Sequence, residues 1–368
     1  MSNTFSKDFF LATKTCEGFF SVFDHLYYPK EGWFCYILKG GPGTGKSTLM
    51  KKIAEKAKEM HIETELIHCS SDPKSLDAVI FPELKICVAD GTDPHVIEPK
   101  YPGVSEKIIN LGEFWNEKKL QKNSEVLIKL LEENKYFHKK ASIYLGALGG
   151  IKKSQNKILK QAAEPEKFQE FMNKLSKTVF GNIKYEKSPN EKLRFTDAIT
   201  PGGYKIFENS LNYEPKNTYV IEDKYEIISN RIMQEIRLES TKRCMNITSF
   251  PTPFFPENQL RAVYLPEVST VFIAKNSKTE SDLFKNLKNI KKINTTKFLN
   301  QDILKSHKNL LTLYEKISSE LLEEITKNLS LALKNHDKIE KIYISAMDYK
   351  KVNKTADKLI SAILTKNP

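Results

Sequence analysis

The sequence predicts an α/β fold in which parallel strands are flanked by helices, duplicated in tandem, with a helical hairpin after each copy. Short apolar, β-rich runs alternate with amphipathic helical segments. A glycine-rich turn joins one of these runs to a helix, and the chain repeats itself internally.

The first 90 residues supply the α/β pattern. Three short segments predict strands: the apolar run Trp33–Lys39, which we expect to be buried, then Glu63–Cys69 and Ile86–Ala89. Between the first two runs, Lys46–Met60 has good helix formers and apolar residues at helical spacing. Strand, helix, strand and strand in this order predict a parallel sheet.

The periodicity changes after the third strand. Apolar residues at helical spacing predict two or three long amphipathic helices over residues 116–178, with a break at Pro165, and then a linker over residues 181–190. We therefore divide the chain into two units. The first is residues 1–190, with a helical segment at about 115–180, and the second is residues 191–368, with C-terminal helices at about 301–366.

The second half of the chain matches the first at an offset of about 183 to 184 residues over the strand segments. Four matches occur in the same order: Thr15–Phe19 with Thr200–Tyr204, Tyr36–Leu38 with Tyr219–Ile221, Pro82–Leu84 with Pro266–Val268, and Ile143–Leu148 with Ile342–Met347. Each match is weak alone, but together they predict a tandem duplication.

Composition indicates a globular, cytoplasmic protein. The 368 residues are 40% hydrophobic and 28% charged, and no apolar run approaches the roughly 18 to 20 residues that span a bilayer. The start of the chain lacks the apolar stretch of a secretory signal. The five cysteines form no CxxC pair, which favours reduced thiols over a metal site.

The net charge of +12 comes almost entirely from lysine. Residues 1–114 hold 13 basic and 16 acidic side chains, whereas residues 115–190 hold 16 and 8, so the predicted helical segment is the basic part. A basic segment is compatible with nucleic acid as a partner, but a lysine-rich proteome explains the bias as well and is favoured.

The glycine-rich turn carries a complete Walker A pattern, between a predicted strand and a predicted helix. It consists of Gly40, Gly41, Pro42, Gly43, Thr44, Gly45, Lys46 and Ser47, followed by Thr48. The glycines let backbone N–H groups point at phosphates, and the helix N-terminus adds partial positive charge. Lys46 is expected on the β- and γ-phosphates and Ser47 on Mg²⁺, which predicts a P-loop that binds ATP with Mg²⁺.

A carboxylate at the end of an apolar strand completes such a site, and Asp90 is the main candidate for the second group on Mg²⁺. Asp72 is its rival, because it also follows the end of a predicted strand. Asp93 and His95 are interpreted as polar residues of a surface loop, and His68 as a hydrogen-bonded structural histidine. The absence of an NKxD motif favours adenine over guanine, and the absence of an LSGGQ signature argues against a transporter-type ATPase.

The repeat predicts that the second half has lost this chemistry. Residues 223–230 correspond to the glycine-rich turn and contain no glycine, while Asp223 and Glu226 would repel a phosphate. Two further changes are Ser229 in the place of Lys46 and Ala274 in the place of Asp90. We expect a pseudo-domain that supports or regulates the first half.

All five arginines lie beyond residue 193. Many P-loop enzymes stabilise transition-state charge with an arginine finger. If this chain supplies its own, the arginine comes from the second half, and Arg194 and Arg261 are the candidates.

The sequence resembles a bacterial family of tandem P-loop ATP-binding proteins that has no assigned substrate. The resemblance rests on Gly40–Ser47, His68–Pro73, Pro82–Leu84, Asp90–Thr92, Pro94–His95, Pro102–Gly103 and Ala198–Pro201. It runs over nearly the whole chain and implies a P-loop NTPase fold in both halves, with nucleotide binding and hydrolysis in the cytoplasm. The second loop of this chain departs from that plan.

The sequence therefore predicts an ATP-binding protein, most simply a Mg²⁺-dependent ATPase (a hydrolase) that is slow or is stimulated by an unknown protein partner or substrate. One alternative is a small-molecule or nucleotide kinase, with residues 115–190 as a substrate lid. Another is an ATP-sensing adaptor that binds nucleic acid through four lysines of that segment, Lys139, Lys140, Lys152 and Lys153.

Overall fold

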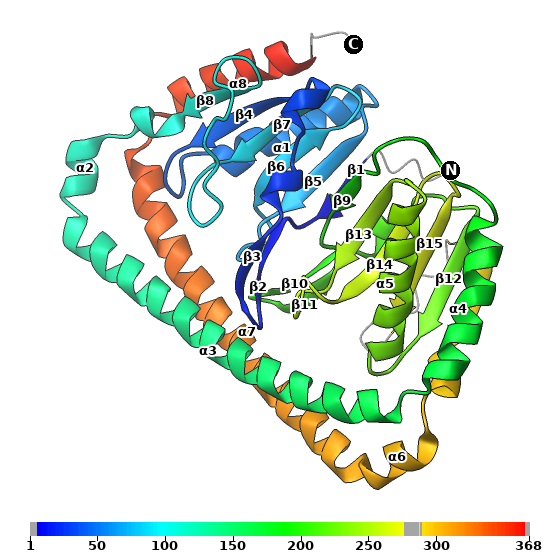
Figure 1. Ribbon diagram of the computed structural model, residues 1–368. Helices are drawn as coiled ribbons and strands as arrows, with labels where there is room; N and C mark the ends of the chain where they lie inside the picture. The colour runs from blue at the N-terminus through cyan, green and yellow to red at the C-terminus, as the bar shows by residue number, and fades with distance from the viewer. Residues whose placement is uncertain (1–5, 276–286, 288, 365–368) are drawn as a thin grey trace.

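The computed structural model describes residues 6–275, 287 and 289–364, and it shows two α/β units joined by long helices (Figure 1). Each unit is built on a six-stranded sheet. Several inner strands are buried along their whole length, as is typical of strands covered on both faces.

The first sheet has the order β1, β5, β6, β7, β4, β8. Its strands are β1 (Ser6–Phe9), β4 (Phe34–Lys39), β5 (Thr64–His68), β6 (Leu76–Phe81), β7 (Ile86–Asp90) and β8 (Glu106–Asn110). The three strands expected from the sequence are β4, β5 and β7. The sheet is mixed and not purely parallel as expected, because β6 runs antiparallel to both neighbours. The connections on either side of β6 are too short for the crossover that a parallel pair needs.

The second sheet repeats this arrangement, in the order β16, β12, β15, β14, β13, β9. Its strands are β9 (Glu191–Leu193), β12 (Asn217–Glu222), β13 (Ile247–Pro251), β14 (Leu260–Leu265), β15 (Thr270–Lys275) and β16 (Ile290–Asn294). Two further elements occur once per unit: a two-stranded ribbon, and a helix that follows β4 in the first unit and β12 in the second. They are β2 (Ala12–Thr15) with β3 (Gly18–Ser21), β10 (Asp197–Thr200) with β11 (Gly203–Ile206), α1 (Lys46–Glu59) and α5 (Ile227–Lys242). The halves are therefore duplicates in structure as well as in sequence.

A helical arm follows each sheet. The first arm is α2 (Glu117–Gln121), α3 (Ser124–Ala162) and α4 (Pro165–Phe180); the second is α6 (Gln301–Ser306), α7 (Lys308–Ala346) and α8 (Tyr349–Leu364). The two 39-residue helices, α3 and α7, lie side by side and run in opposite directions (Figure 1). The arms are therefore not the expected hairpins, because each long helix pairs with the long helix of the other arm.

Each arm ends on the opposite unit. At the end of the first arm, α4 packs on α5 of the second unit, and Phe168 and Met172 enter the core of that unit. At the end of the second arm, α8 packs on α1, and Leu359 and Ile363 enter the core of the first unit. Neither unit completes its core without an arm that belongs to the other half.

The two places where an arm begins are equivalent in the two halves. Trp115 bridges Met347 where the first arm begins, and Ala163 bridges Leu299 where the second arm begins. The members of these bridges are related by the repeat, since Trp115 and Leu299 lie about 184 residues apart, as do Ala163 and Met347. The match of residues 342–347 with the middle of α3 was therefore wrong, because that segment corresponds to the end of α3.

The two sheets also share a core. The backbone N–H of Phe10 donates to the carbonyl oxygen of Phe195 at 2.8 Å, and Phe195 returns a bond at 3.0 Å. Beside this bridge the buried guanidinium of Arg194 lies 2.9 Å from Glu65. Burial alone would raise the pKa of Glu65, but Arg194 and Lys192 outweigh it and lower the pKa to about 2. Arg194 thus joins the two units through Glu65 and is not placed as the arginine finger that the sequence suggested.

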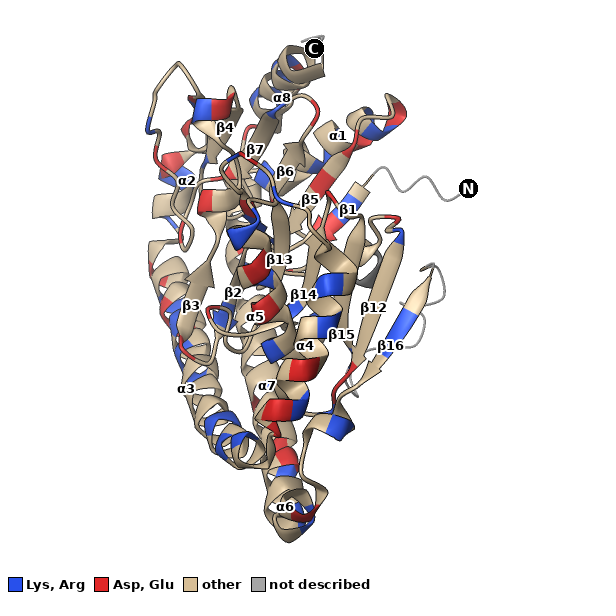
Figure 2. Cartoon of the chain, turned by 45° about the vertical axis from the view of Figure 1, so that its right-hand side comes forward, with Lys and Arg blue, Asp and Glu red and all other residues tan. Residues whose placement is uncertain are grey.

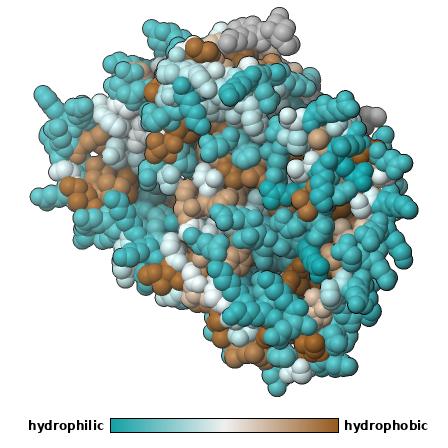
Figure 3. All heavy atoms as spheres, in the orientation of Figure 1, coloured by the Kyte–Doolittle hydropathy of each residue, from teal (hydrophilic) through white to brown (hydrophobic). Residues whose placement is uncertain are grey.

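The face of the molecule shown in Figure 3 is mainly hydrophilic. On the face in Figure 3, apolar residues form separate groups divided by hydrophilic ones. Along α3 and α7 charged residues recur (Figure 2), and no helix of the described part of the chain is long and apolar enough to cross a bilayer.

Replacing Arg194 by methionine is expected to lower the free energy of unfolding by about 3 to 5 kcal/mol, because the buried Glu65 would lose its guanidinium partner and keep only Lys192 as a cation. Urea unfolding measures the loss. The matched control is the double variant Glu65→Gln/Arg194→Met, which should regain most of the stability. A single variant as stable as the wild type would show that the pair does not join the units.

The same pair should make the unfolding free energy depend on acid. Because the pKa of Glu65 is lowered from 4.5 to about 2 in the folded chain, its contribution is complete above about pH 4.5 and is lost as the pH falls towards 2. Unfolding curves recorded across this range test the dependence. Glu65→Gln should have a shallower pH profile than the wild type, and identical profiles would count against the assignment.

Candidate functional site

The glycine-rich loop lies at the carboxyl end of β4 and leads into α1. On its two sides β4 pairs in parallel with β7 and β8, so residues that follow these strands meet at one edge of the sheet. Gly43 and Gly45 have φ values of 69° and 92°, which favour glycine. At Gly40, a Cβ would lie 2.8 Å from the Thr44 hydroxyl oxygen. The shape of the loop therefore requires the glycines of the motif.

The N-terminus of α1 faces this loop without a capping side chain. Gly45 is the N-cap residue and has no side chain, and in the described part of the chain no side chain accepts a hydrogen bond from the first backbone N–H groups of the helix. The Thr44 hydroxyl instead donates to the Gly41 carbonyl oxygen at 2.9 Å, inside the loop, and Thr48 is exposed on the first turn. The partial positive charge of the helix end is thus directed at the loop interior, as in helix sites for anions.

Lys46 folds back over the loop. Its Nζ donates to the carbonyl oxygens of Gly40 at 2.6 Å and Gly41 at 3.0 Å, and it lies 3.5 Å from Oδ2 of Asp90. The side chain is only 10% exposed. The ammonium is therefore held at the mouth of the loop by groups that a phosphate oxygen would replace with a stronger, charge-assisted bond.

Ser47 and Asp90 lie on either side of this lysine. Asp90 ends β7, directly opposite Leu38 at the end of β4. Its Oδ1 accepts from the backbone N–H and the hydroxyl of Thr92, at 2.9 and 2.6 Å. The Ser47 hydroxyl accepts from the backbone N–H of Leu76 at 3.0 Å. The fold thus brings together Lys46, Ser47 and Asp90, which the sequence assigned to one site.

The second arm covers the loop from outside. A Cβ at Gly43 would lie 2.9 Å from the carbonyl oxygen of Glu340 in α7, so the two backbones are in close contact. The Tyr349 hydroxyl at the start of α8 donates to the Gly43 carbonyl oxygen at 2.6 Å, and Tyr343 packs beside Gly41. The loop of the first half is therefore in direct contact with the arm of the second half.

Two buried polar side chains beside this site escaped the sequence analysis or were misjudged there. Asp77 lies in β6, and burial together with the neighbouring Asp90 raises its pKa to about 8. The imidazole of His95 is 6% exposed, 3.8 Å from the Asp77 carboxylate, and stacked on Phe23 with ring centroids 4.4 Å apart. Neither ring nitrogen has a hydrogen-bond partner among the residues that the structure describes, and burial lowers the pKa of the ring. His95 is therefore not the surface-loop residue that was expected.

A signal for Asp77 was present in the sequence, because it is the one acid within the apolar run Leu76–Phe81. The other residues considered there have simpler roles. Asp72 stabilises its own turn, accepting from the Lys74 N–H at 3.2 Å and the Ser75 hydroxyl at 2.5 Å. Asp93 is exposed. As expected, His68 is structural, with ring nitrogens 2.9 Å from the Pro73 carbonyl oxygen and 2.7 Å from the carboxylate of Asp8.

The equivalent loop of the second unit is filled by the chain itself. The carboxylate of Asp223, which follows β12, accepts from the backbone N–H of Ser229 at 2.7 Å and of Tyr225 at 3.2 Å. It thus lies at the N-terminus of α5, where the first unit has no side chain. The sequence predicted that Asp223 would repel a phosphate, and its carboxylate in fact takes an anion's place at the helix end.

Arg261 occupies in β14 the position that Asp77 has in β6. Its guanidinium lies 3.3 Å from both Asp197 and Glu226 and donates to the Tyr204 hydroxyl at 2.6 Å. These partners all belong to the second unit, so Arg261 does not serve the first loop as the arginine finger that was considered.

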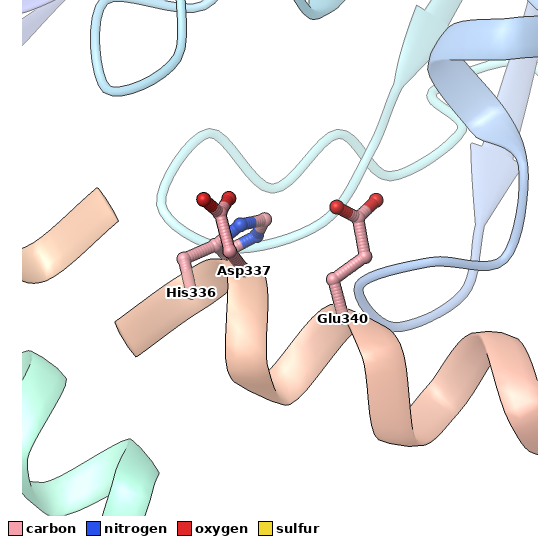
Figure 4. A group of neighbouring side chains, drawn as sticks. All are labelled: His336, Asp337 and Glu340. Atoms are coloured by element: carbon pink, nitrogen blue, oxygen red, sulfur yellow. The ribbon is translucent and has the colours of Figure 1, made fainter. Parts of the chain in front are cut away.

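A further group of polar side chains lies on α7. His336, Asp337 and Glu340 project from the same side of the helix (Figure 4), and their ligand atoms lie within 4.8 Å of one another. Acidic groups on neighbouring helix turns commonly lie this close without an ion, so we assign no metal to them.

Comparisons of the chain with protein-family models, with curated proteins and with solved structures found no match. The interpretation of the site therefore rests on its own residues and on the comparison between the two halves.

Replacing Gly43 by alanine tests the contact between the loop and the second arm. Gly103 is a matched control, because it has a similar φ of 77° but no neighbouring atom within 4 Å of an added Cβ. Both variants carry the cost of a left-handed alanine, but only Gly43→Ala meets Glu340, so it should be less stable than Gly103→Ala by about 1 to 3 kcal/mol. Equal losses in thermal unfolding would mean that the arm does not press on the loop.

Proposed function

We propose that the first unit binds ATP and Mg²⁺ through a P-loop formed by Gly40–Thr48, in a P-loop NTPase fold, and transfers the γ-phosphoryl group with water as the simplest acceptor. The observation that supports this most is the contrast between the two loops. In the first, the N-terminus of α1 has no capping side chain and the ammonium of Lys46 lies beside it. In the second, the carboxylate of Asp223 occupies the equivalent helix end. A phosphate can occupy the helix end in the first loop, whereas in the second loop a carboxylate already occupies that place.

Each polar group of the first loop has a role in this proposal. The backbone N–H groups bind the phosphate oxygens, and Lys46 exchanges its two carbonyl partners for oxygens of the β- and γ-phosphates. Ser47 and Asp90 would hold Mg²⁺, and their oxygen donors suit that ion. When bound, Mg²⁺ neutralises the charge that develops on the transferred group. The absence of an NKxD motif favours adenine as the base.

The second unit acts in this proposal as a pseudo-domain that supports the active one. Its own loop is filled, but its arm reaches the first loop through Glu340 and Tyr349. A movement of α7, for example on binding of a protein partner to the arms, would therefore change the geometry of the phosphate site.

The nucleic-acid adaptor is less well supported than the ATPase or the kinase. The latter part of α3 is basic (Figure 2). However, Lys152 lies over the ring of Phe254 at 4.3 Å, and Lys153 pairs with Glu17 at 2.8 Å. Two of the four lysines considered for nucleic acid therefore pack against the body of the protein.

Lys46→Ala is the first test. The wild type should bind one ATP per chain in equilibrium dialysis with Mg²⁺ and release phosphate, and the variant should lose both, because the alanine carries no charge to the phosphates. The matched control is Lys224→Ala, in the filled loop of the second unit, which should bind one ATP as the wild type does. Two ATP per chain would contradict the account of the second loop, and binding that Lys46→Ala leaves intact would contradict the account of the first. Transfer to an added acceptor without hydrolysis would identify a kinase.

A further inference from the structure

The two buried side chains beside the phosphate site, Asp77 and His95, have no part in holding the nucleotide. We propose that they form the acceptor subsite of the reaction: the hydroxyl oxygen that attacks the γ-phosphorus, from water or from a substrate alcohol, lies between the two side chains, and Asp77 takes its proton. This inference rests on the proposed ATP-dependent phosphoryl transfer and deepens it.

The separation of the two side chains matches that of two groups bridged by one oxygen atom. Nε2 of His95 and Oδ1 of Asp77 are 3.8 Å apart, which is too far for a direct hydrogen bond. An oxygen about 2.8 Å from each atom fits this separation as the apex of a triangle, bonded to both. Such an oxygen would give a hydrogen-bond partner to one of the two ring nitrogens of His95, which have none among the described residues.

The pair lies on the phosphate side of the site. Leu76, which precedes Asp77, donates its backbone N–H to the hydroxyl of Ser47. The pairing of Ala78 with Ala89 puts Asp77 and Asp90 at neighbouring positions on adjacent strands. The ionisable groups that face Asp77 include Asp90, Asp72 and the Cys69 thiol, and those that face His95 include Asp90 and Asp93. Repulsion between the carboxylates of Asp77 and Asp90 destabilises the fold, so a structural role does not explain the pair. A carboxylate beside a transferred phosphoryl group can act as a base.

The second unit provides an internal comparison. Where the glycine loop is filled, the residue equivalent to Asp77 is Arg261, and its charge is met by Asp197 and Glu226. The unit without an open loop has thus replaced the acid by a paired cation. In the unit with an open loop, the buried carboxylate is retained next to another carboxylate.

The proposed step balances in atoms and charge. The acceptor oxygen forms a bond to the γ-phosphorus while the bond from that phosphorus to the β,γ-bridging oxygen breaks, and ADP leaves with the electron pair. The acceptor proton passes to a carboxylate oxygen of Asp77 and from there to solvent, with His95 holding the acceptor oxygen in place.

Two conservative substitutions in the full-length chain test the inference. Asp77→Asn removes the base and keeps its size, and His95→Phe keeps the stack on Phe23 and removes the ring nitrogens. Both should bind ATP with a Kd within about threefold of the wild type. Phosphoryl transfer should fall about 100-fold in the first and about tenfold or more in the second. Neither should lower the melting temperature, because Asp77→Asn removes a carboxyl group that lies beside the like charge of Asp90, and His95→Phe removes ring nitrogens that make no hydrogen bond within the described part of the chain. The matched control is Asp93→Asn, an exposed carboxylate of the loop that carries His95, and it should behave as the wild type.

The outcomes separate this inference from the proposed function. Transfer within threefold of the wild type in both variants, with ATP still bound, would overturn the acceptor subsite alone. Loss of transfer together with a melting temperature lowered by several degrees would assign the pair a structural role instead. A wild type that binds no ATP would overturn both proposals.

The acceptor is identified in the same experiment. Phosphate release is measured in buffer and then with added ribonucleosides as hydroxyl acceptors. Loss of free phosphate in Asp77→Asn indicates water, and loss of a phosphorylated nucleoside indicates an alcohol. If the wild type turns over neither, binding of ADP with aluminium fluoride, which mimics the transferred group, replaces turnover as the readout. That complex should weaken at least tenfold in Asp77→Asn while ADP binding alone stays unchanged, and equal affinity in the two proteins would overturn the subsite.

Discussion

The antiparallel pairing of α3 and α7 is the constraint on which the rest of the structure depends. Helices of 39 residues are each about 58 Å long, enough to carry the chain from one unit to the other. Because α3 and α7 lie side by side and run in opposite directions, the helices that follow them, α4 and α8, pack on opposite units. Residues of α4 and α8 complete the cores that contain α5 and α1. The open loop of the first unit is covered for the same reason, since α7 ends and α8 begins beside it.

Much of the fold was predictable from local patterns. Short runs rich in strand-forming residues identified β4, β5 and β7, and helical spacing identified α1, because burial of a strand or of one helix stripe leaves a direct trace in the sequence. The direction of β6 and the exchange of the arms were not predictable in this way. Both depend on which surfaces meet in space, and an amphipathic helix carries the same apolar stripe whether it packs on its own unit or on the other.

The candidate site likewise contains residues that a local pattern predicts and residues that only the folded structure brings together. The glycine loop, Lys46, Ser47 and Asp90 were identified because a short motif and its flanking elements specify their geometry locally. Asp77 and His95 come from different segments and meet only through the sheet, so no spacing rule connects them. The same limit applies to Arg194, whose role between the two units depends on Glu65, about 130 residues away in the chain. Charge and burial become informative about such residues only when the neighbours are known.

The exchanged arms give the chain the form of a domain-swapped homodimer whose two subunits have been joined end to end. In a homodimer every substitution appears in both subunits, so one loop cannot lose its glycines while the other keeps them. Once two copies are encoded in a single chain, each can change separately. One copy can then fill its loop with an acidic side chain and devote its arm to the neighbour's loop. The asymmetry between Asp223 in one unit and Lys46 in the other is the kind of divergence that only a fused pair can inherit.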